Sequence, residues 1–188
     1  MTPALVVIGA SLGGLTALKA VLAALPRAYA APVAVVQHRT TDAGDALQIV
    51  LQDSCALAVT EAADKMMIEA GHVYLAPPGY HLLVEAEHFS LSTEEPVLYA
   101  RPSIDLLFET AAQTHGARAC GVVLTGTGQD GAAGAAAIRR GGGRLVIESP
   151  ATAQEGEMPQ GALEATNGAV QLPLAQIGPY LAKLGKAD

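Results

Sequence analysis

Short aliphatic runs alternate with longer amphipathic segments along most of this chain, and this alternation constrains the fold more than any other feature of the sequence. The runs at 4–9, 32–37 and 120–126 have the length and aliphatic content of buried parallel strands, and the segments between them have the spacing of helices. Tryptophan is absent and phenylalanine occurs twice among 188 residues, so the core has to be built from Ala, Val, Leu and Ile. We therefore predict an α/β fold formed by a single domain over residues 1–188.

Local signals place further elements along the chain. We expect Pro26 to end a first helix, Asp42 to cap a second, and Ser103 to cap a third. After Gly71, three short β-like runs follow one another too closely for crossover helices, so we predict antiparallel pairing there, with a tight turn near 86–88. The expected helices cover 15–25, 42–51, 103–115, 130–142 and 172–185, and further strands cover 55–60 and 144–149.

Charge and cysteine usage exclude several classes of function. Eleven basic against eighteen acidic residues give a net charge of −7 with no basic run, so we expect no nucleic-acid partner. No apolar stretch reaches the roughly 18 residues of a membrane span, and the N-terminus lacks the basic segment of a signal peptide, which predicts a cytoplasmic protein without membrane insertion. Cys55 and Cys120 lie in apolar surroundings without metal-ligand spacing, so we predict free buried thiols rather than a disulfide, and no metal site.

The segment VVIGASLGGL at 6–15 runs from a strand into a glycine-rich turn that has three interpretations. A dinucleotide fingerprint needs G-x-G-x-x-G, but Ser11 occupies the second glycine position and no acidic residue closes the second strand. As G-x-S-x-G, with Gly9, Ser11 and Gly13, the turn would expose a nucleophilic hydroxyl between strand and helix. Alternatively, Ser11 only caps the helix that follows. The turn by itself does not decide between capping and catalysis.

A base and an orienting acid for Ser11 should directly follow other strands, because ligands bind at the carboxyl ends of the strands in open α/β sheets. His38 follows the run at 32–37, and Asp130 follows the segment 121–129. His81 is a further candidate that either lines the rim of the pocket or only packs near it. In α/β-hydrolases the acid precedes the histidine and the nucleophile follows several strands. The order found here therefore predicts a serine hydrolase on a different doubly wound sheet.

Six segments resemble the catalytic domain of CheB, the chemotaxis protein-glutamate methylesterase family, and they occur in the order found in that family. They cover almost the whole sequence: VVIGASLGGL (6–15), VVQH (35–38), GHVYLAPPGYHLLVE (71–85), RPSIDLLFETAA (101–112), GVVLTGTGQDGAAGAAAIRRGGG (121–143) and MPQGAL (158–163). The resemblance implies a Rossmann-like, doubly wound, mostly parallel sheet with helices on both faces and an inserted antiparallel β-hairpin.

The same resemblance implies a mechanism. Ser11 would be the nucleophile, His38 the base, and Asp130 the residue that orients the histidine. The implied reaction is hydrolysis of γ-glutamyl methyl esters on the cytoplasmic helices of methylated chemoreceptors, with deamidation of receptor glutamines as a related activity. No cofactor is required. We expect backbone amides near Leu12 and Thr127 to hold the oxyanion.

Three positions depart from the residues common in the family. Leu12 stands where Thr is frequent, Thr127 where Met is frequent, and Arg39 where a Met usually follows the histidine. If Leu12 and Thr127 act through their backbone amides, the changes are tolerable; if their side chains shape the pocket, specificity differs. Arg39 either meets the acidic flanks of a methylation helix or points into solvent, and it could build a positive potential together with Arg101 and Arg118.

Full-length members of the family carry an N-terminal receiver domain, whereas this chain reaches its candidate nucleophile at residue 11. We expect either a fragment or a stand-alone esterase, and Met1 before a complete strand favours a natural start. A stand-alone form would be constitutively accessible or controlled in trans, for instance by a separate receiver domain. Two alternatives to the esterase are a binding or regulatory domain of the same fold that has lost turnover, and a nucleotide-binding domain.

Overall fold

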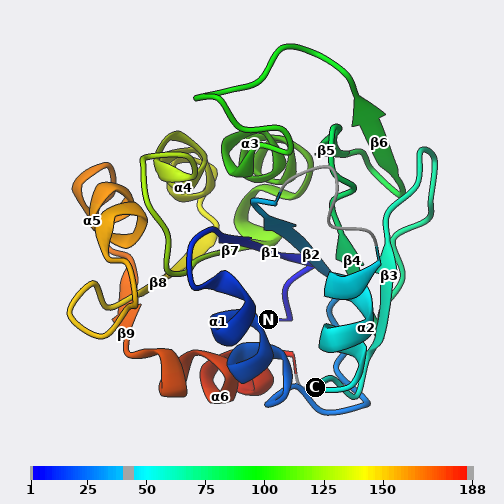
Figure 1. Ribbon diagram of the computed structural model, residues 1–188, viewed down its shortest axis with the longest axis horizontal. Helices are drawn as coiled ribbons and strands as arrows, with labels where there is room; N and C mark the ends of the chain where they lie inside the picture. The colour runs from blue at the N-terminus through cyan, green and yellow to red at the C-terminus, as the bar shows by residue number, and fades with distance from the viewer. Residues whose placement is uncertain (1, 40–44, 186–188) are drawn as a thin grey trace.

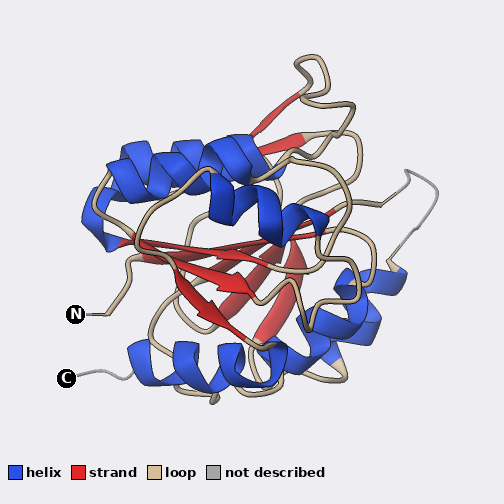
Figure 2. Cartoon of the chain, turned by 90° about the vertical axis from the view of Figure 1, so that its left-hand side faces the viewer, coloured by secondary structure: helices blue, strands red, loops and turns tan. Residues whose placement is uncertain are grey.

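The computed structural model describes residues 2–39 and 45–185, which form a parallel sheet between two layers of helices (Figure 1, Figure 2). The seven strands lie in the order β3-β4-β2-β1-β7-β8-β9, and each pairs in parallel with its neighbours. The strands of this sheet are β1 (Leu5–Ala10), β2 (Val33–Gln37), β3 (Ala58–Glu61), β4 (His72–Leu75), β7 (Ala119–Val123), β8 (Arg144–Glu148) and β9 (Val170–Leu172). The helices are α1 (Gly14–Leu22), α2 (Ala46–Gln52), α3 (Ile104–His115), the 3₁₀ turn η2 (Gly116–Arg118), α4 (Ala132–Arg140), α5 (Glu157–Glu164) and α6 (Leu174–Leu184).

Side chains of the central strand β1 point alternately to the two faces of the sheet and join two separate cores. Val6, Ile8 and Ala10 pack in the core that contains the apolar residues of α1 and α6. Leu5 and Val7 pack in the core formed with α3, α4 and α5. This period of two is what a strand covered by helices on both sides requires. The predicted doubly wound α/β fold is therefore confirmed.

The chain reverses direction of winding at β1, and this reversal positions the candidate site. The strands β2, β4 and β3 lie in that order on one side of β1, whereas β7, β8 and β9 lie on the other side (Figure 1). The carboxyl ends of β2, β1 and β7 consequently lie next to one another. Ligands of open α/β sheets bind at such a switch point, beyond the carboxyl ends of the strands.

The region after Gly71 is only partly as predicted. Strands β5 (His81–Val84) and β6 (Phe89–Ser92) form the expected antiparallel hairpin, separate from the main sheet. Strand β4, by contrast, lies between β2 and β3 and pairs with both in parallel, so the expected antiparallel pairing of β4 is wrong. Residues 62–71 connect β3 to its parallel neighbour β4 without a helix. A short connection between two strands therefore does not by itself imply that they are antiparallel.

Several predicted boundaries also differ from the structure. Helix α1 ends at Leu22 rather than Leu25, because the amides of Ala24 and Leu25 donate to carbonyls three residues back and tighten the chain before Pro26. The sequence pattern did not predict α5 or the short strand β9. Ser103 caps α3 as expected, whereas the predicted cap Asp42 lies outside the described residues. Both cysteines are buried and free, as predicted.

Candidate active site

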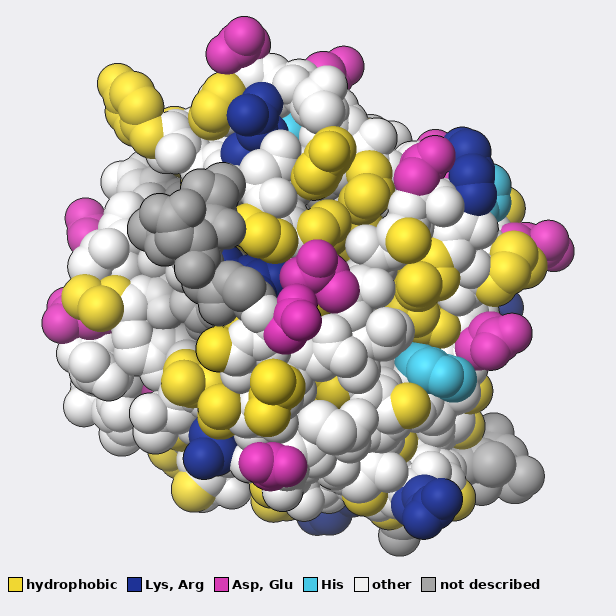
Figure 3. All heavy atoms as spheres, turned by 45° about the vertical axis from the view of Figure 1, so that its right-hand side comes forward, with side chains coloured by type: hydrophobic (Ala, Val, Ile, Leu, Met, Phe, Trp, Pro, Cys, Tyr) yellow, Lys and Arg dark blue, Asp and Glu magenta, His cyan; other side chains and the backbone are white. Residues whose placement is uncertain are grey.

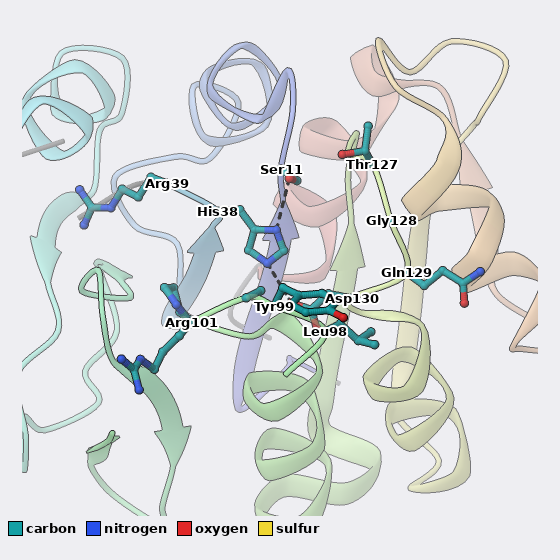
Figure 4. Close-up of a pocket in the computed structure, with 12 residues that line it drawn as sticks. Ser11, His38, Arg39, Leu98, Tyr99, Arg101, Thr127, Gly128, Gln129 and Asp130 are labelled. Atoms are coloured by element: carbon teal, nitrogen blue, oxygen red, sulfur yellow. Dashed lines mark hydrogen bonds and ion pairs between the residues drawn. The ribbon is translucent and has the colours of Figure 1, made fainter. Parts of the chain in front are cut away.

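Three polar side chains that follow different strands meet at the switch point of the sheet. Ser11 follows β1, His38 follows β2, and Asp130 follows β7 at the start of the turn into α4. Ser11 Oγ lies 3.2 Å from His38 Nδ1, and His38 Nε2 lies 2.8 Å from Asp130 Oδ2 (Figure 4). The structure thus connects the three residues that strand-end position selected in the sequence.

The turn that carries Ser11 is held by hydrogen bonds to the backbone of Ser11, and the Ser11 side chain does not cap the helix. The Ser11 amide donates to the Thr125 carbonyl over 3.0 Å, and Gln37 Nε2 donates to the Ser11 carbonyl over 2.8 Å. The N-cap of α1 is Gly13, whose φ is +81° and which offers no side-chain cap. Ser11 Oγ faces His38 instead. Capping of α1 by Ser11 is therefore the wrong interpretation of the glycine turn.

A missing side chain on the neighbouring loop leaves room for the nucleophile. A Cβ at Gly126 would lie 2.7 Å from Ser11 Cβ and would also collide with the Met158 sulfur. No Cβ approaches another heavy atom so closely in real structures. Glycine at this position thus allows the loop after β7 to pass directly beside Ser11.

The hydrogen bonds of His38 fix which ring nitrogen carries the proton. An ionised Asp130 can only accept hydrogen bonds, so the Nε2 that faces it must be the N–H of the neutral ring. Nδ1 then has a free lone pair directed at the Ser11 hydroxyl. A general base for serine requires an unprotonated ring nitrogen facing the hydroxyl, and Nδ1 meets this requirement here.

Asp130 receives four hydrogen bonds, two on each carboxylate oxygen. Oδ2 accepts from His38 and from the Ile104 amide at 2.7 Å, and Oδ1 accepts from the Ser103 hydroxyl and the Asp105 amide, both at 2.9 Å. Burial alone would raise the pKa of Asp130, yet the bonds from His38 and the two amides outweigh it, and the pKa lies below its ordinary value. His38 and the α3 N-terminus together keep Asp130 ionised.

The two helices α3 and α4 cap each other through their acidic residues. While Asp130 accepts from the first turn of α3, Asp105 of α3 accepts from the amides of Gly131 and Gly134 at the start of α4, at 2.9 and 2.7 Å. Burial raises the pKa of Asp105 to about 6, and the charge of Asp130 acts in the same direction. Glycine at 134 permits the close approach, since a Cβ there would lie 2.6 Å from Phe108 Cβ. The reciprocal caps lock Asp130 to both helices.

A cavity of about 450 Å³ opens beside the three residues. Its lining consists of Ser11, His38, Arg39, Leu98, Tyr99, Ala100, Arg101, Pro102, Thr127, Gly128, Gln129 and Asp130 (Figure 4). A second, shallower hollow of about 380 Å³ borders Ser11 and His38 from the side of α1, and Leu12 and Leu15 line it. The Ser11–His38 pair is thus accessible from two sides.

Several backbone amides at the site have no acceptor within the described part of the chain. They include the amide of Leu12, directly after Ser11, and that of Thr127, in the loop after β7. The neighbouring Gly128 amide, by contrast, donates to Glu157 over 2.8 Å. Free amides beside a nucleophile are the donors that a developing oxyanion needs.

The remaining sequence candidates occupy different environments. Leu12 and Thr127 are exposed and border the hollow and the cavity, respectively. Arg39 lines the cavity, but its side chain is largely buried and forms an ion pair with Glu61. It therefore does not project into solvent. Arg118 lines a separate pocket with Cys120 and Arg144 at the other end of β7, so it does not converge with Arg39, a question that the sequence left open.

His81 is fully buried and does not line the cavity, which corrects its place among the pocket candidates. Its Nδ1 accepts from the Ser103 amide at 3.2 Å, and its Nε2 donates to the Glu95 carbonyl at 3.2 Å. His81 therefore supports Ser103, whose hydroxyl in turn donates to Asp130. Sequence reasoning did not identify Ser103 and Asp105 as part of the site. Their position in the first turn of a helix was the available signal, but it indicated only capping.

Comparisons with known proteins place this arrangement in a family. The family model described as CheB methylesterase matches residues 6–181. The chain belongs to the CheB methylesterase family. The crystal structure of the Thermotoga maritima CheB methylesterase catalytic domain aligns with a TM-score of 0.93 and 31% identity, over 98% of this chain and 100% of that one. The predicted family and fold are therefore confirmed.

Relatives among curated CheB-type proteins agree on the reaction. FrzG of Myxococcus xanthus, a protein-glutamate methylesterase, is 40% identical over 94% of this chain and 53% of its own length. A Bordetella avium protein-glutamate methylesterase/protein-glutamine glutaminase is 41% identical, and the match covers 96% of this chain and 53% of that protein. A Leptospira interrogans protein, provisionally named for the same two activities, is 41% identical, and the match covers 95% of this chain and 93% of that protein. The chain is a CheB-type methylesterase domain, and the predicted hydrolase class is confirmed.

No group of three or more His, Cys, Asp or Glu side chains within 2–39 and 45–185 is placed to hold a metal ion. In the same ranges, no helix is long and apolar enough to cross a bilayer.

Proposed function

We propose that Ser11, His38 and Asp130 carry out hydrolysis of γ-glutamyl methyl esters on methyl-accepting chemoreceptors. The observation that carries this proposal is the continuous hydrogen-bonded chain from Ser11 through His38 to Asp130, at the edge of a cavity that can admit a side chain. CheB-type methylesterases act on methyl-accepting chemoreceptors, which supplies the substrate class.

The first half-reaction forms an acyl-enzyme. Ser11 Oγ attacks the ester carbonyl carbon while its proton passes to His38 Nδ1, and the Leu12 and Thr127 amides donate to the developing oxyanion. Asp130 stabilises the imidazolium through Nε2–H. When the tetrahedral intermediate collapses, the methoxy oxygen takes the proton from Nδ1 and leaves as methanol.

The second half-reaction reverses these roles with water in place of the alcohol. His38 removes a proton from water, the resulting hydroxide attacks the acyl carbonyl, and Ser11 Oγ leaves with the proton from Nδ1. The products are free glutamate and the regenerated serine. A glutamine side chain enters the same sequence with ammonia as the leaving group, which matches the glutaminase activity in the name of the Bordetella avium relative.

The test is methanol release from receptor membranes carrying radiolabelled methyl esters. The parent protein should release labelled methanol, and Ser11→Ala should lower kcat by up to about 10⁶-fold, as loss of a triad serine does elsewhere. A fluorophosphonate probe should label Ser11 stoichiometrically in the parent. Undiminished release by Ser11→Ala would refute the nucleophile assignment, and a folded parent that neither labels nor releases methanol would support a regulatory domain without turnover.

A further inference from the structure

The loop before α3 holds two bulky residues in a backbone conformation that favours glycine and asparagine. Leu98 and Tyr99 have φ values of +48° and +66°. They are the two central residues of a tight turn. The Val97 amide donates to the Ala100 carbonyl over 3.1 Å, and the Ala100 amide donates to the Val97 carbonyl over 2.8 Å. Turns with positive φ at both central positions strongly prefer Asn-Gly. Leucine and tyrosine at these two positions are therefore strained.

Packing within the chain does not explain these residues. Leu98 is 59% exposed and Tyr99 is completely exposed. Other apolar side chains also lie on the surface (Figure 3), so exposure alone indicates little. What distinguishes this pair is strain combined with exposure beside a candidate active site, where strained residues tend to cluster for functional reasons.

The turn is fixed relative to the reacting groups. Leu98 and Tyr99 line the same cavity as Ser11 and His38 (Figure 4). Next to the turn, the Arg101 guanidinium donates to the Thr93 and Glu94 carbonyls, both at 3.0 Å, and thereby ties the two ends of the loop together. The chain then enters α3 at Ser103, which is bonded to Asp130. The apolar pair is thus presented at a defined position beside the nucleophile.

We propose that Leu98 and Tyr99 form an apolar subsite, which binds the substrate helix through a hydrophobic side chain about one helical turn from the esterified glutamate. This inference rests on the proposed function. Residues three and four positions apart lie on the same side of a helix, so a helix that places its ester at Ser11 presents such a neighbour to one side. Leu12 and Leu15, exposed along the opposite hollow, lie on the other side of the nucleophile.

The decisive variant replaces the pair by the residues that the turn prefers. L98N/Y99G relieves the strain and removes both apolar side chains, so its thermal unfolding midpoint should equal or exceed that of the parent. Its kcat/KM for methylated receptor should fall by about 10- to 100-fold, because two apolar contacts are lost. Its rate of labelling by a small fluorophosphonate should stay within about twofold of the parent, since the probe reaches Ser11 without the subsite.

Met67→Ser is the matched control. Met67 is 51% exposed and lines neither the cavity nor the hollow, so this variant should leave both rates unchanged. The substrate can be changed as well, by placing serine at the apolar position three or four residues from the ester. This change should lower kcat/KM of the parent, but it should not lower kcat/KM of L98N/Y99G any further.

The outcomes separate this inference from the proposed function. A receptor kcat/KM for L98N/Y99G equal to that of the parent would overturn the subsite, as would a matching loss of fluorophosphonate labelling, because the turn would then only support Ser11. Failure of the parent itself to release methanol would overturn the proposed function and the subsite with it. Selective loss of receptor activity, with labelling and stability intact, supports the subsite.

Discussion

Asp105→Asn should make the folded protein more stable at neutral pH and leave its stability unchanged in acid. Asp105 is almost completely buried, and burial raises its pKa to about 6 from an ordinary value of 3.8. The folded protein therefore binds this proton more tightly than the unfolded chain, and the free energy of unfolding falls as the pH rises from about 4 to 6. At about 1.4 kcal/mol per pKa unit, the full effect is about 3 kcal/mol.

Asparagine keeps the hydrogen bonds while removing the charge. Its Oδ1 can accept from the Gly131 and Gly134 amides as the carboxylate oxygen does. We expect the variant to unfold with a free energy up to about 3 kcal/mol higher than the parent at pH 7.5, and with an equal free energy below pH 4. Urea denaturation followed by far-UV circular dichroism measures this, since the chain has no tryptophan. Glu148, whose pKa burial also raises, titrates in both proteins and cancels from the difference.

Asp105→Ala separates charge from hydrogen bonding. It removes the acceptor of two amides at the start of α4, so at every pH it should be less stable than Asp105→Asn by about 1–3 kcal/mol per unsatisfied amide. A difference between Asp105→Asn and the parent that does not change between pH 4 and 7.5 would refute the reasoning, because another group would then be responsible for the titration. Lower stability of the asparagine variant at pH 7.5 would refute it as well.

Three further substitutions test the support of the site. Asp130→Asn removes the charge that holds His38 as the Nε2–H tautomer, and kcat for receptor methyl esters should fall by about 10³- to 10⁴-fold. Ser103→Ala removes both the cap of α3 and a donor to Asp130, and urea denaturation should show a loss of about 1–3 kcal/mol. Gly126→Ala would place a Cβ 2.7 Å from Ser11 Cβ, and fluorophosphonate labelling of Ser11 should slow by about 10²-fold. Gly161→Ala is the control, because its Cβ would have no neighbour nearer than 3.9 Å, and Ser11 should be labelled at the parent rate.

The residues that follow strands were predictable because parallel strands fix where their ends lie. Ser11 and His38 each come directly after a buried strand, and Asp130 lies in the connection from β7 to α4. The parallel sheet brings the ends of these three strands together at one edge. His81 failed as a pocket candidate for the opposite reason. It begins β5, which lies off the main sheet, so its direction depends on packing against Ser103 that no local pattern records.

The support of the site could not be predicted from local patterns. In the sequence, Ser103 and Asp105 have the pattern of ordinary residues at a helix start. Only the packing of α3 against α4 brings Ser103 into hydrogen-bond contact with Asp130, and Asp105 with the amides of α4. Leu98 and Tyr99 carry no turn signal, since their residue types contradict the backbone they adopt. Tertiary contacts override local preference at each of these positions, as is common near functional sites.

The pairing of β1 with β7 joins two halves of the chain that each hold part of the catalytic group. Ser11 and His38 precede the exposed segment 93–96, and Asp130 follows it. A cut within 93–96 would leave the nucleophile and base on one fragment and their acid on the other. Esterase activity in a mixture of the two fragments would then report their association through the β1–β7 pairing and the contacts of α3 with β5 and of α1 with α6, which makes this fold a candidate for a split-enzyme sensor.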